Sequence, residues 1–172
     1  MKTPLALGCV CSLLWLASPA RATASPADFK GLWELNRAES ESMRPLLAAQ
    51  GYTGFEIGIL ERVSVAQQIE PSGVGRLQIR TKTSVVASTE DLLLDDVARP
   101  ADSPLGRVER AAAWDEPAQT LRTRIKYQAR NGQAAEMWIT RRRLDAGRFA
   151  QETRLRLADG REFRARQIFV RR

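Results

Sequence analysis

Residues 29–40 read FKGLWELNRAES, and this stretch decides the fold because it begins a series of strands. Within residues 29–36, the apolar side chains of Phe29, Trp33 and Leu35 fall on one side of an extended chain. Polar residues occupy most of the positions between them, and this period of two is typical of a β-strand. The sequence therefore predicts that the chain opens with a strand.

A helical segment is expected directly after this strand. Residues 38–50 are rich in helix-forming side chains, with Ser40 as the expected N-cap and Gly51 as the residue that ends the helix. Pro45 lies close enough to the start of this segment to be tolerated in a helix. Residues 51–60 have room for a second short helix.

The rest of the chain reads as strands of about ten residues separated by tight turns. Asn131-Gly132 is the strongest hairpin signal, and residues 100–106, with two prolines, are expected to form a loop. Strands are expected at residues 63–70, 76–84, 85–94, 107–114, 120–130, 134–144, 149–157 and 161–170. A single antiparallel meander of this length normally closes on itself, so the pattern predicts a small all-β barrel with a helical insert.

The first 24 residues have the three parts of a secretory signal peptide. A lysine follows Met1, residues 5–16 are almost entirely apolar, and Ala22 and Ala24 supply small side chains before a cleavage site at Ser25. A membrane anchor is the competing interpretation, but this apolar run is shorter than the roughly 20 residues needed to span a bilayer. We therefore expect a signal peptide over residues 1–24, one barrel domain over residues 25–172, and a secreted or periplasmic location.

Composition narrows the chemistry that the domain could perform. The chain has no histidine, and its two cysteines, Cys9 and Cys11, lie within the predicted signal peptide. Disulfides, thiolate or histidine metal sites and nucleophile–histidine pairs are therefore excluded from the mature chain. Carboxylate, lysine or tyrosine chemistry remains, without a motif to support it. We expect no enzyme activity and no cofactor or metal.

The basic residues form strips on single faces of the expected strands. The chain has 27 lysines and arginines against 20 acidic residues, and removal of Lys2 and Arg21 with the signal peptide leaves 25 against 20, a net charge of +5. One interpretation is a cationic surface for nucleic acid, lipopolysaccharide or anionic lipid. The other is the solvated exterior of a barrel, favoured because acidic residues are interspersed and aromatic interleaving is missing. We expect a monomer that binds no specific nucleic acid and makes weak contact with anionic membrane surfaces.

Several motifs resemble the fatty-acid-binding, or intracellular lipid-binding, proteins of the calycin superfamily. Residues 29–40 are similar to the F-x-G-x-W-x-L opening strand of that family. Matching segments follow in the same order over nearly all of the mature chain. These are MRPLLAAQG at 43–51, LQIRTKTS at 77–84, Trp114-Asp115, ITRRRLDAG at 139–147, and the closing strand at 166–171.

This resemblance implies a flattened ten-stranded barrel with a helix–turn–helix lid after the first strand. It also implies reversible binding of a fatty acid, a retinoid or a related lipid. In the family, the polar end of the ligand meets a basic or amide residue on the eighth strand, which maps to Arg142. It also meets an Arg-x-Tyr pair on the last strand, which maps to Gln167 and Phe169. Because Arg142 lies between two other arginines, a register error of one residue would exchange inward and outward positions.

Other residues are expected to share these roles by their position. Trp138 and Thr140 alternate in step with Arg142 and would line the pocket with Thr123 and Tyr127 of the preceding strand. Trp33 would fill the floor of the barrel. The underside of the lid, which forms the portal, would comprise Met43, Leu46, Leu47 and Phe55.

Two hypotheses of function follow. The first is an exported binding protein that encloses a small hydrophobic ligand for transport or sequestration. The second is a barrel whose cavity is filled by side chains and which acts as an interaction or envelope module. Gln167 stands where fatty-acid binders usually carry an arginine, so the head group of a ligand stays open: an alcohol, an amide or a carboxylate.

Overall fold

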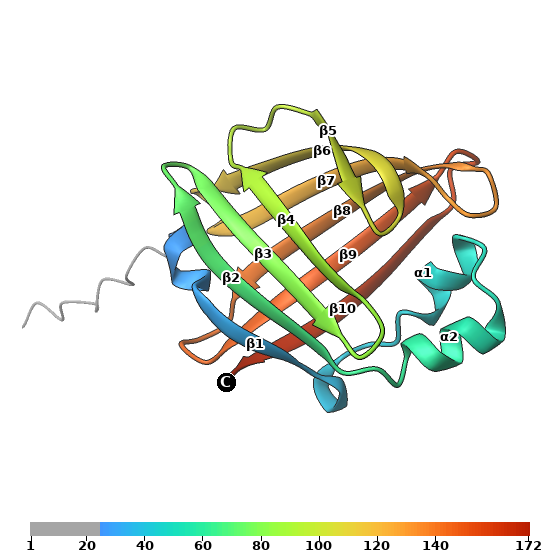
Figure 1. The fold of residues 1–172 in the computed structure, drawn as a ribbon, viewed down its shortest axis with the longest axis horizontal. Helices are drawn as coiled ribbons and strands as arrows, with labels where there is room; N and C mark the ends of the chain where they lie inside the picture. Colours follow the sequence, from blue (N-terminus) through green and yellow to red (C-terminus); the bar gives the residue numbers. More distant parts are fainter. Residues whose placement is uncertain (1–24) are drawn as a thin grey trace, which may run out of the picture.

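The computed structural model describes residues 25–172 and forms a ten-stranded antiparallel β-barrel, as predicted (Figure 1). The predicted signal peptide at residues 1–24 lies outside the described residues. The strands run in the order β4-β3-β2-β1-β10-β9-β8-β7-β6-β5. Their bounds are β1 Gly31–Asn36, β2 Val65–Gly73, β3 Arg76–Thr83, β4 Ala87–Leu93, β5 Arg99–Ser103, β6 Gly106–Asp115, β7 Thr120–Gln128, β8 Ala134–Arg143, β9 Arg148–Leu157 and β10 Glu162–Arg171.

The expectation of a loop at residues 100–106 is wrong, because the structure has the short strand β5 there. Pro100 lies in this strand and pairs with Glu109 of β6. A proline is tolerated at this place because β5 is an edge strand with a hydrogen-bonded neighbour on one side only. The barrel is therefore ten-stranded and nearly closed, with a gap between β4 and β5.

Two short helices follow β1, but they begin later than predicted. The 3₁₀ turn η2 (Arg37–Glu39) leads to α1 (Arg44–Ala49) and α2 (Gly54–Leu60). Ser40 is not the N-cap of α1; its side chain instead accepts a hydrogen bond from the backbone N–H of Ile168 in β10 at 2.9 Å. Pro45 lies in the first turn of α1, as expected. Among residues 25–172, no helix has the length and apolar character required to cross a bilayer.

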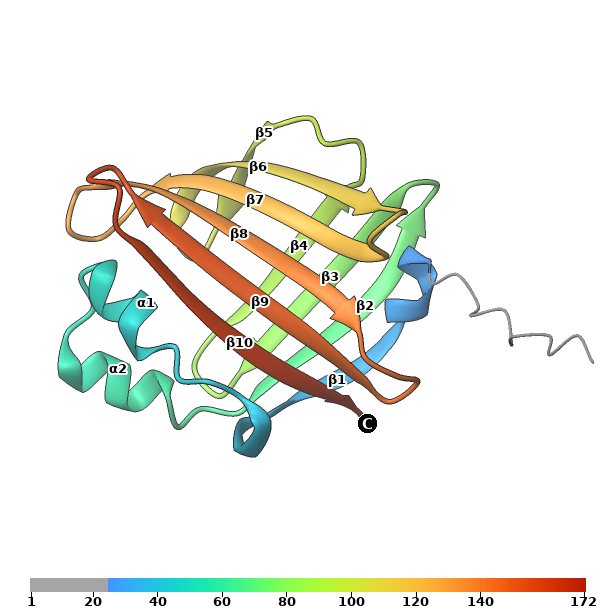
Figure 2. The same ribbon diagram turned by 180° about the vertical axis from the view of Figure 1, so that it is seen from behind.

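The helices cover one end of the barrel and an aromatic floor closes the other. In Figures 1 and 2, α1 and α2 lie beside the β7–β8 turn, and the 3₁₀ turn η1 (Pro26–Phe29) lies at the opposite end. At the floor, Phe149 stacks on Phe169 with ring centroids 4.9 Å apart and meets Trp33 and Phe29 edge to face. These aromatic side chains are fully buried, so Trp33 fills the floor as predicted.

A candidate ligand site inside the barrel

A layer of polar side chains crosses the interior between two apolar clusters. The floor cluster contains Trp33 and Phe149, and the cluster at the lid end contains Leu46 and Leu155. Between them the strands turn polar groups inward. We call the following residues the polar layer: Gln67, Glu90, Arg110, Thr123, Arg141, Gln151, Thr153 and Gln167. A barrel that needed only a packed core would gain stability from apolar side chains at these positions.

Two arginines in the polar layer have hydrogen-bond donors without partners. Arg141 of β8 is 3% exposed and Arg110 of β6 is 7% exposed. Nε and Nη1 of Arg141, and Nε and Nη2 of Arg110, have no hydrogen-bond partner within residues 25–172. The hydroxyl oxygen of Thr123, on the strand between them, is also unpaired. Buried polar groups are normally paired, so this cluster is prepared for acceptor atoms that the described chain does not supply.

Glu90 of β4 is the carboxylate of the polar layer. Its Oε1 lies 3.6 Å from Nη2 of Arg110, which is ion-pair range but longer than a hydrogen bond. Desolvation by burial lowers the pKa of Arg141 to about 10, and the charge of Glu90 acts in the opposite direction. With this pKa, Arg141 keeps its charge at neutral pH. The layer therefore holds two guanidinium groups against one carboxylate.

Three glutamines extend the layer toward β2 and β10. Gln67 donates to Gln151 at 3.4 Å, and Gln151 donates to Gln167 at 3.3 Å. Gln151 also lies directly across from Arg141 in the register of β8 and β9. These bonds are at the long limit for hydrogen bonds, so an incoming head group could replace them at small cost.

The structure places Arg142 on the outside of the barrel, so its predicted inward position is wrong by one residue. Arg142 is exposed, and Arg141 points inward instead. The register was available in the sequence, since Met137 and Ile139, the two large aliphatic residues of this strand, share the parity of Arg141. The same parity would have identified Arg110, which alternates with Val108 and Ala112 on β6.

Trp138 and Thr140 share the outward face of Arg142, so their predicted position in the pocket is also wrong. The remaining predicted lining residues do face inward. Thr123, Tyr127 and Phe169 are buried and Gln167 is partly buried. The hydroxyl of Tyr127 donates to Gln50 at 2.6 Å, and desolvation by burial raises the pKa of Tyr127. Ligand contact by these four residues stays a prediction.

The predicted portal residues divide between the two sides of the lid. Leu46 is fully buried against the barrel, and Met43 and Leu47 are partly buried beside it. Phe55 is 78% exposed, so its expected place on the underside of the lid is wrong. Because α2 begins at Gly54, its inward side falls at Ile57, roughly half a turn away from Phe55.

Two recesses reach the polar layer from different sides. One of about 330 Å³ lies under the helices, lined by Met43 and Leu47 of the lid and by Gln167 of the layer. The other, of about 200 Å³, opens at the gap between β4 and β5 and reaches Arg110 and Ala112. The first recess lies where the portal was predicted, and the second was not predicted.

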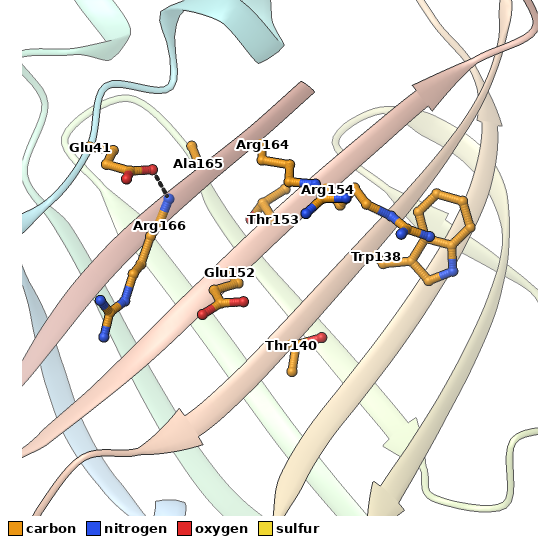
Figure 3. Close-up of a pocket in the computed structure, with 9 residues that line it drawn as sticks. All are labelled: Glu41, Trp138, Thr140, Glu152, Thr153, Arg154, Arg164, Ala165 and Arg166. Carbon is orange, nitrogen blue, oxygen red and sulfur yellow. Dashed lines mark hydrogen bonds between the residues drawn. The ribbon is translucent and has the colours of Figure 1, made fainter. Parts of the chain in front are cut away.

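A third recess, of about 510 Å³, lies on the outer face of β8–β10 (Figure 3). Trp138, Arg154 and Arg164 meet there, and the guanidinium of Arg154 lies 4.2 Å from the ring centroid of Trp138. In the strand register, Arg124, Trp138, Arg154 and Arg164 stand side by side across β7–β10, and we call them the Arg–Trp row. The prediction that the basic strips lack an aromatic residue is therefore wrong.

Comparison with known proteins identifies the fold. No protein-family model and no curated protein matches the sequence. Apo lipid binding protein 8 of Caenorhabditis elegans shares the fold with a TM-score of 0.68 at 14% identity, over 88% of this chain and 100% of that chain. The REP1-NXSQ fatty acid transporter matches with a TM-score of 0.66 at 16% identity, over 85% and 97%. Human cRBP IV matches with a TM-score of 0.62 at 18% identity, over 86% and 100%. Likeness at these identities establishes a common fold, and function has to be argued from the site.

Proposed function

We propose that this protein encloses a small hydrophobic ligand with a negatively charged head group inside its barrel. The observation that carries the proposal is the pair of buried arginines, Arg110 and Arg141, whose donors have no partner in the described chain. A carboxylate is the simplest group that satisfies them, because it accepts two parallel hydrogen bonds from one guanidinium. A fatty acid carries such a head group on an apolar chain.

The apolar part of this ligand has a surface to cover on the lid side of the polar layer. The recess beneath the helices places Met43, Leu47 and Leu60 opposite Leu35 and Val65 of the barrel wall. Burial of an alkyl chain against such side chains contributes about 25 cal/mol per Å² of apolar surface removed from water. The head group would supply orientation, and the chain would supply most of the free energy of binding.

The printed names of two proteins with this fold, a lipid binding protein and a fatty acid transporter, support the same class of ligand. Gln167 departs from the arginine that the sequence resemblance implies at this position of the last strand. Its amide could donate to a carboxylate oxygen, but it adds no charge, so Arg141 would be the principal partner of the head group.

Binding can be tested with two ligands and two matched variants. We expect isothermal titration calorimetry to show that hexadecanoate binds the wild-type protein more tightly than hexadecanol. Arg141→Met should reduce hexadecanoate affinity by about tenfold to a hundredfold, the value of a buried charge-assisted hydrogen bond, and leave hexadecanol affinity nearly unchanged. Arg142→Met, one residue away on the exposed face, should change neither affinity. Failure of the wild-type protein to bind either ligand would refute the proposal.

We also propose that the protein acts outside the cytosol, after removal of residues 1–24. The part of the chain after the predicted cleavage site supplies its own barrel floor, in which Phe29 and Trp33 pack. Export would leave this packing intact. N-terminal sequencing of the protein recovered from the extracytoplasmic fraction should begin at Ser25; a start at Met1 would contradict the proposal.

A second candidate function, docking on an anionic membrane surface, is favoured by the Arg–Trp row. Arg154 and Arg164 stand directly opposite each other on β9 and β10, a like-charge pairing that destabilises a sheet. Glu162 compensates it only in part, since its carboxylate lies 3.6 Å from Arg164. In an adjacent row, carboxylates alternate with cations in Lys126, Glu136, Arg156 and Glu162. Tryptophan beside arginine is typical of a surface that meets lipid head groups.

Matched triple variants test this second function. Replacement of Arg124, Arg154 and Arg164 by serine removes three charges from the Arg–Trp row. Replacement of Arg76, Arg80 and Lys82 by serine removes three charges from the outer face of β3. We expect only the first variant to lose sedimentation with phosphatidylglycerol vesicles at low ionic strength, with no binding to phosphatidylcholine vesicles by any form. Equal losses in both variants would indicate a general charge effect and refute a specific surface.

A further inference from the structure

Glu90 of β4 places a carboxylate beside the two buried arginines of the polar layer. We propose that this carboxylate makes the polar layer selective for an amphiphile whose head group carries one negative charge, such as a carboxylate or sulfonate, over a dianionic phosphate monoester. The inference rests on the proposed function, since it concerns the ligand of the same site. It adds a specificity-determining residue that no sequence motif indicated.

The charge balance of the polar layer leads to this selectivity. Arg110 and Arg141 are the cations of the layer and Glu90 is its carboxylate. The layer therefore has one positive charge in excess. A monoanionic head group brings the layer to neutrality, whereas a dianion leaves one negative charge buried beside Glu90. An uncompensated buried charge is among the most costly features in a protein interior.

The geometry keeps the arginines available although Glu90 is close. The 3.6 Å separation between Oε1 of Glu90 and Nη2 of Arg110 leaves this donor without a hydrogen bond. Arg141 has two further unpaired donors, and Glu90 influences it through space without a direct bond. A head group can therefore bind the guanidinium groups while Glu90 stays in place as a nearby negative charge.

Glu90 lies on the wall of the barrel, where its charge would act on a bound head group. It lies on β4, next to the gap, and pairs in register with Ile79 of β3. Arg110 faces it from β6 and also lines the recess at the β4–β5 gap. A second negative charge on the head group would lie close to Glu90. The electrostatic repulsion between these two charges is stronger in a protein interior than in water, because the dielectric constant there is lower.

Four ligands of one chain length separate the possible outcomes. Dodecanoate and dodecanesulfonate carry one charge, dodecyl phosphate carries two at pH values well above its second pKa of about 6, and dodecanol carries none. Calorimetric titration of the wild-type protein at about pH 8, above the second pKa of the phosphate and below the pKa of about 10 of Arg141, should give at least a roughly tenfold preference for the sulfonate over the phosphate. Sulfonate keeps its charge at every pH used, so its affinity reports on the protein alone.

Glu90→Gln changes this preference if the inference is correct. Without the negative charge of Glu90, both anionic ligands should bind more tightly. The gain in binding free energy should be about twice as large for the dianion as for the monoanion, because its head group carries twice the charge. The phosphate-to-sulfonate affinity ratio should therefore rise by about tenfold. Dodecanol affinity should stay the same. Glu109→Gln, which removes a carboxylate from the exposed side of β6 next to Arg110, serves as the matched control and should leave the ratio unchanged.

Glu90→Gln leaves two buried arginines without a nearby carboxylate, and this could destabilise the fold. A second variant therefore removes one of the two positive charges as well. Glu90→Gln combined with Arg110→Gln restores one excess positive charge in the layer, and its ratio should return to the wild-type value. Arg110→Gln alone makes the layer neutral, and it should shift the preference from sulfonate toward dodecanol by about tenfold or more. An unchanged ratio in Glu90→Gln, or an unchanged preference in Arg110→Gln, would overturn the inference. If the wild-type protein binds none of the four ligands, the proposed function itself fails.

Discussion

At the scale of single residues, Arg141 and Arg142 show how position decides the role of a side chain. The two are identical in chemistry and adjacent in sequence, yet Arg141 is buried in the polar layer and Arg142 is exposed. The pleat of β8 accounts for this difference, because successive side chains point to opposite faces of the sheet. Arg141 costs the empty barrel stability through desolvation, and such a cost at one site is expected where a residue serves binding.

Phenylalanines at two sites give a residue-scale prediction about stability. Phe169 is 1% exposed and stacks on Phe149, whereas Phe55 is 78% exposed on α2. Phe169→Ala should therefore lower the free energy of unfolding by roughly 3–5 kcal/mol, because it leaves a cavity in the floor. Phe55→Ala should change it by no more than about 0.5 kcal/mol. Urea denaturation followed by tryptophan fluorescence measures both, and equal effects would contradict the burial that we describe.

At the scale of elements, the lid is held to the barrel by polar contacts at its ends. Thr53 and Glu56 form a capping box at the start of α2, and the carboxylate of Glu56 also pairs with Arg130 of the β7–β8 turn at 2.6 Å. The side chain of Asn131, in the same turn, donates to the backbone oxygen of Ala49 in α1 at 3.0 Å. Both helices are short, so these contacts and the burial of Leu46 stabilise them more than helix propensity does.

Acid should loosen this attachment. Hydrogen bonds from the Thr53 backbone and then from Arg130 lower the pKa of Glu56 from 4.5 to about 2. Because the pKa is lower in the folded state, the stabilisation is complete above pH 4.5 and is lost as the pH falls from there toward 2. NMR amide signals of α2 should shift over this range in the wild-type protein. Glu56→Gln should abolish the titration and resemble the acid form at neutral pH; an identical titration in this variant would exclude Glu56 as its source.

At the scale of the whole molecule, the barrel is asymmetric in both hydrogen bonding and charge. β4 and β5 are the two ends of the sheet, and an isolated bridge pairs Asp95, in the connection that follows β4, with Ala113 of β6. The face formed by β7–β10, toward the viewer in Figure 2, carries the Arg–Trp row. The gap, the lid and this outer face are therefore three separate surfaces, and the proposals above assign a different role to each.

Edge strands should exchange their backbone amide hydrogens before central ones. β5 has five residues and one hydrogen-bonded neighbour, whereas β9 has ten residues and lies between β8 and β10. Hydrogen–deuterium exchange followed by mass spectrometry should therefore label residues 99–103 much faster than residues 148–157. Added hexadecanoate should protect the residues around Arg141 if the proposed function is correct. Equal rates in β5 and β9 would contradict an open edge at the gap.

The sequence by itself determined an antiparallel β-barrel, the helical insert after the first strand, and the buried floor at Trp33, whereas the number of ten strands came from the family resemblance. These features depend on a period of two, on turn residues such as Asn131-Gly132, and on hydrophobic side chains that recur through whole strands. Each is a local or repeated signal, so an error at one residue leaves the prediction intact. The inward positions of Thr123, Gln167 and Phe169 were found in the same way.

Only the tertiary structure decided which chemistry the interior holds. Arg110, Glu90 and Arg141 come from β6, β4 and β8, and no spacing in the sequence relates them. Arg142 was chosen over Arg141 because the family resemblance places this contact two residues before Leu144, although the parity of Met137 and Ile139 favours Arg141. Pro100 concealed β5 because a proline is tolerated at the edge of a sheet, and only the assembled sheet shows which strand forms that edge. The pattern within a strand predicts which of its residues share a face. Which residues of different strands lie near each other inside the barrel depends on the curvature of the sheet, and that curvature is a property of the whole sheet.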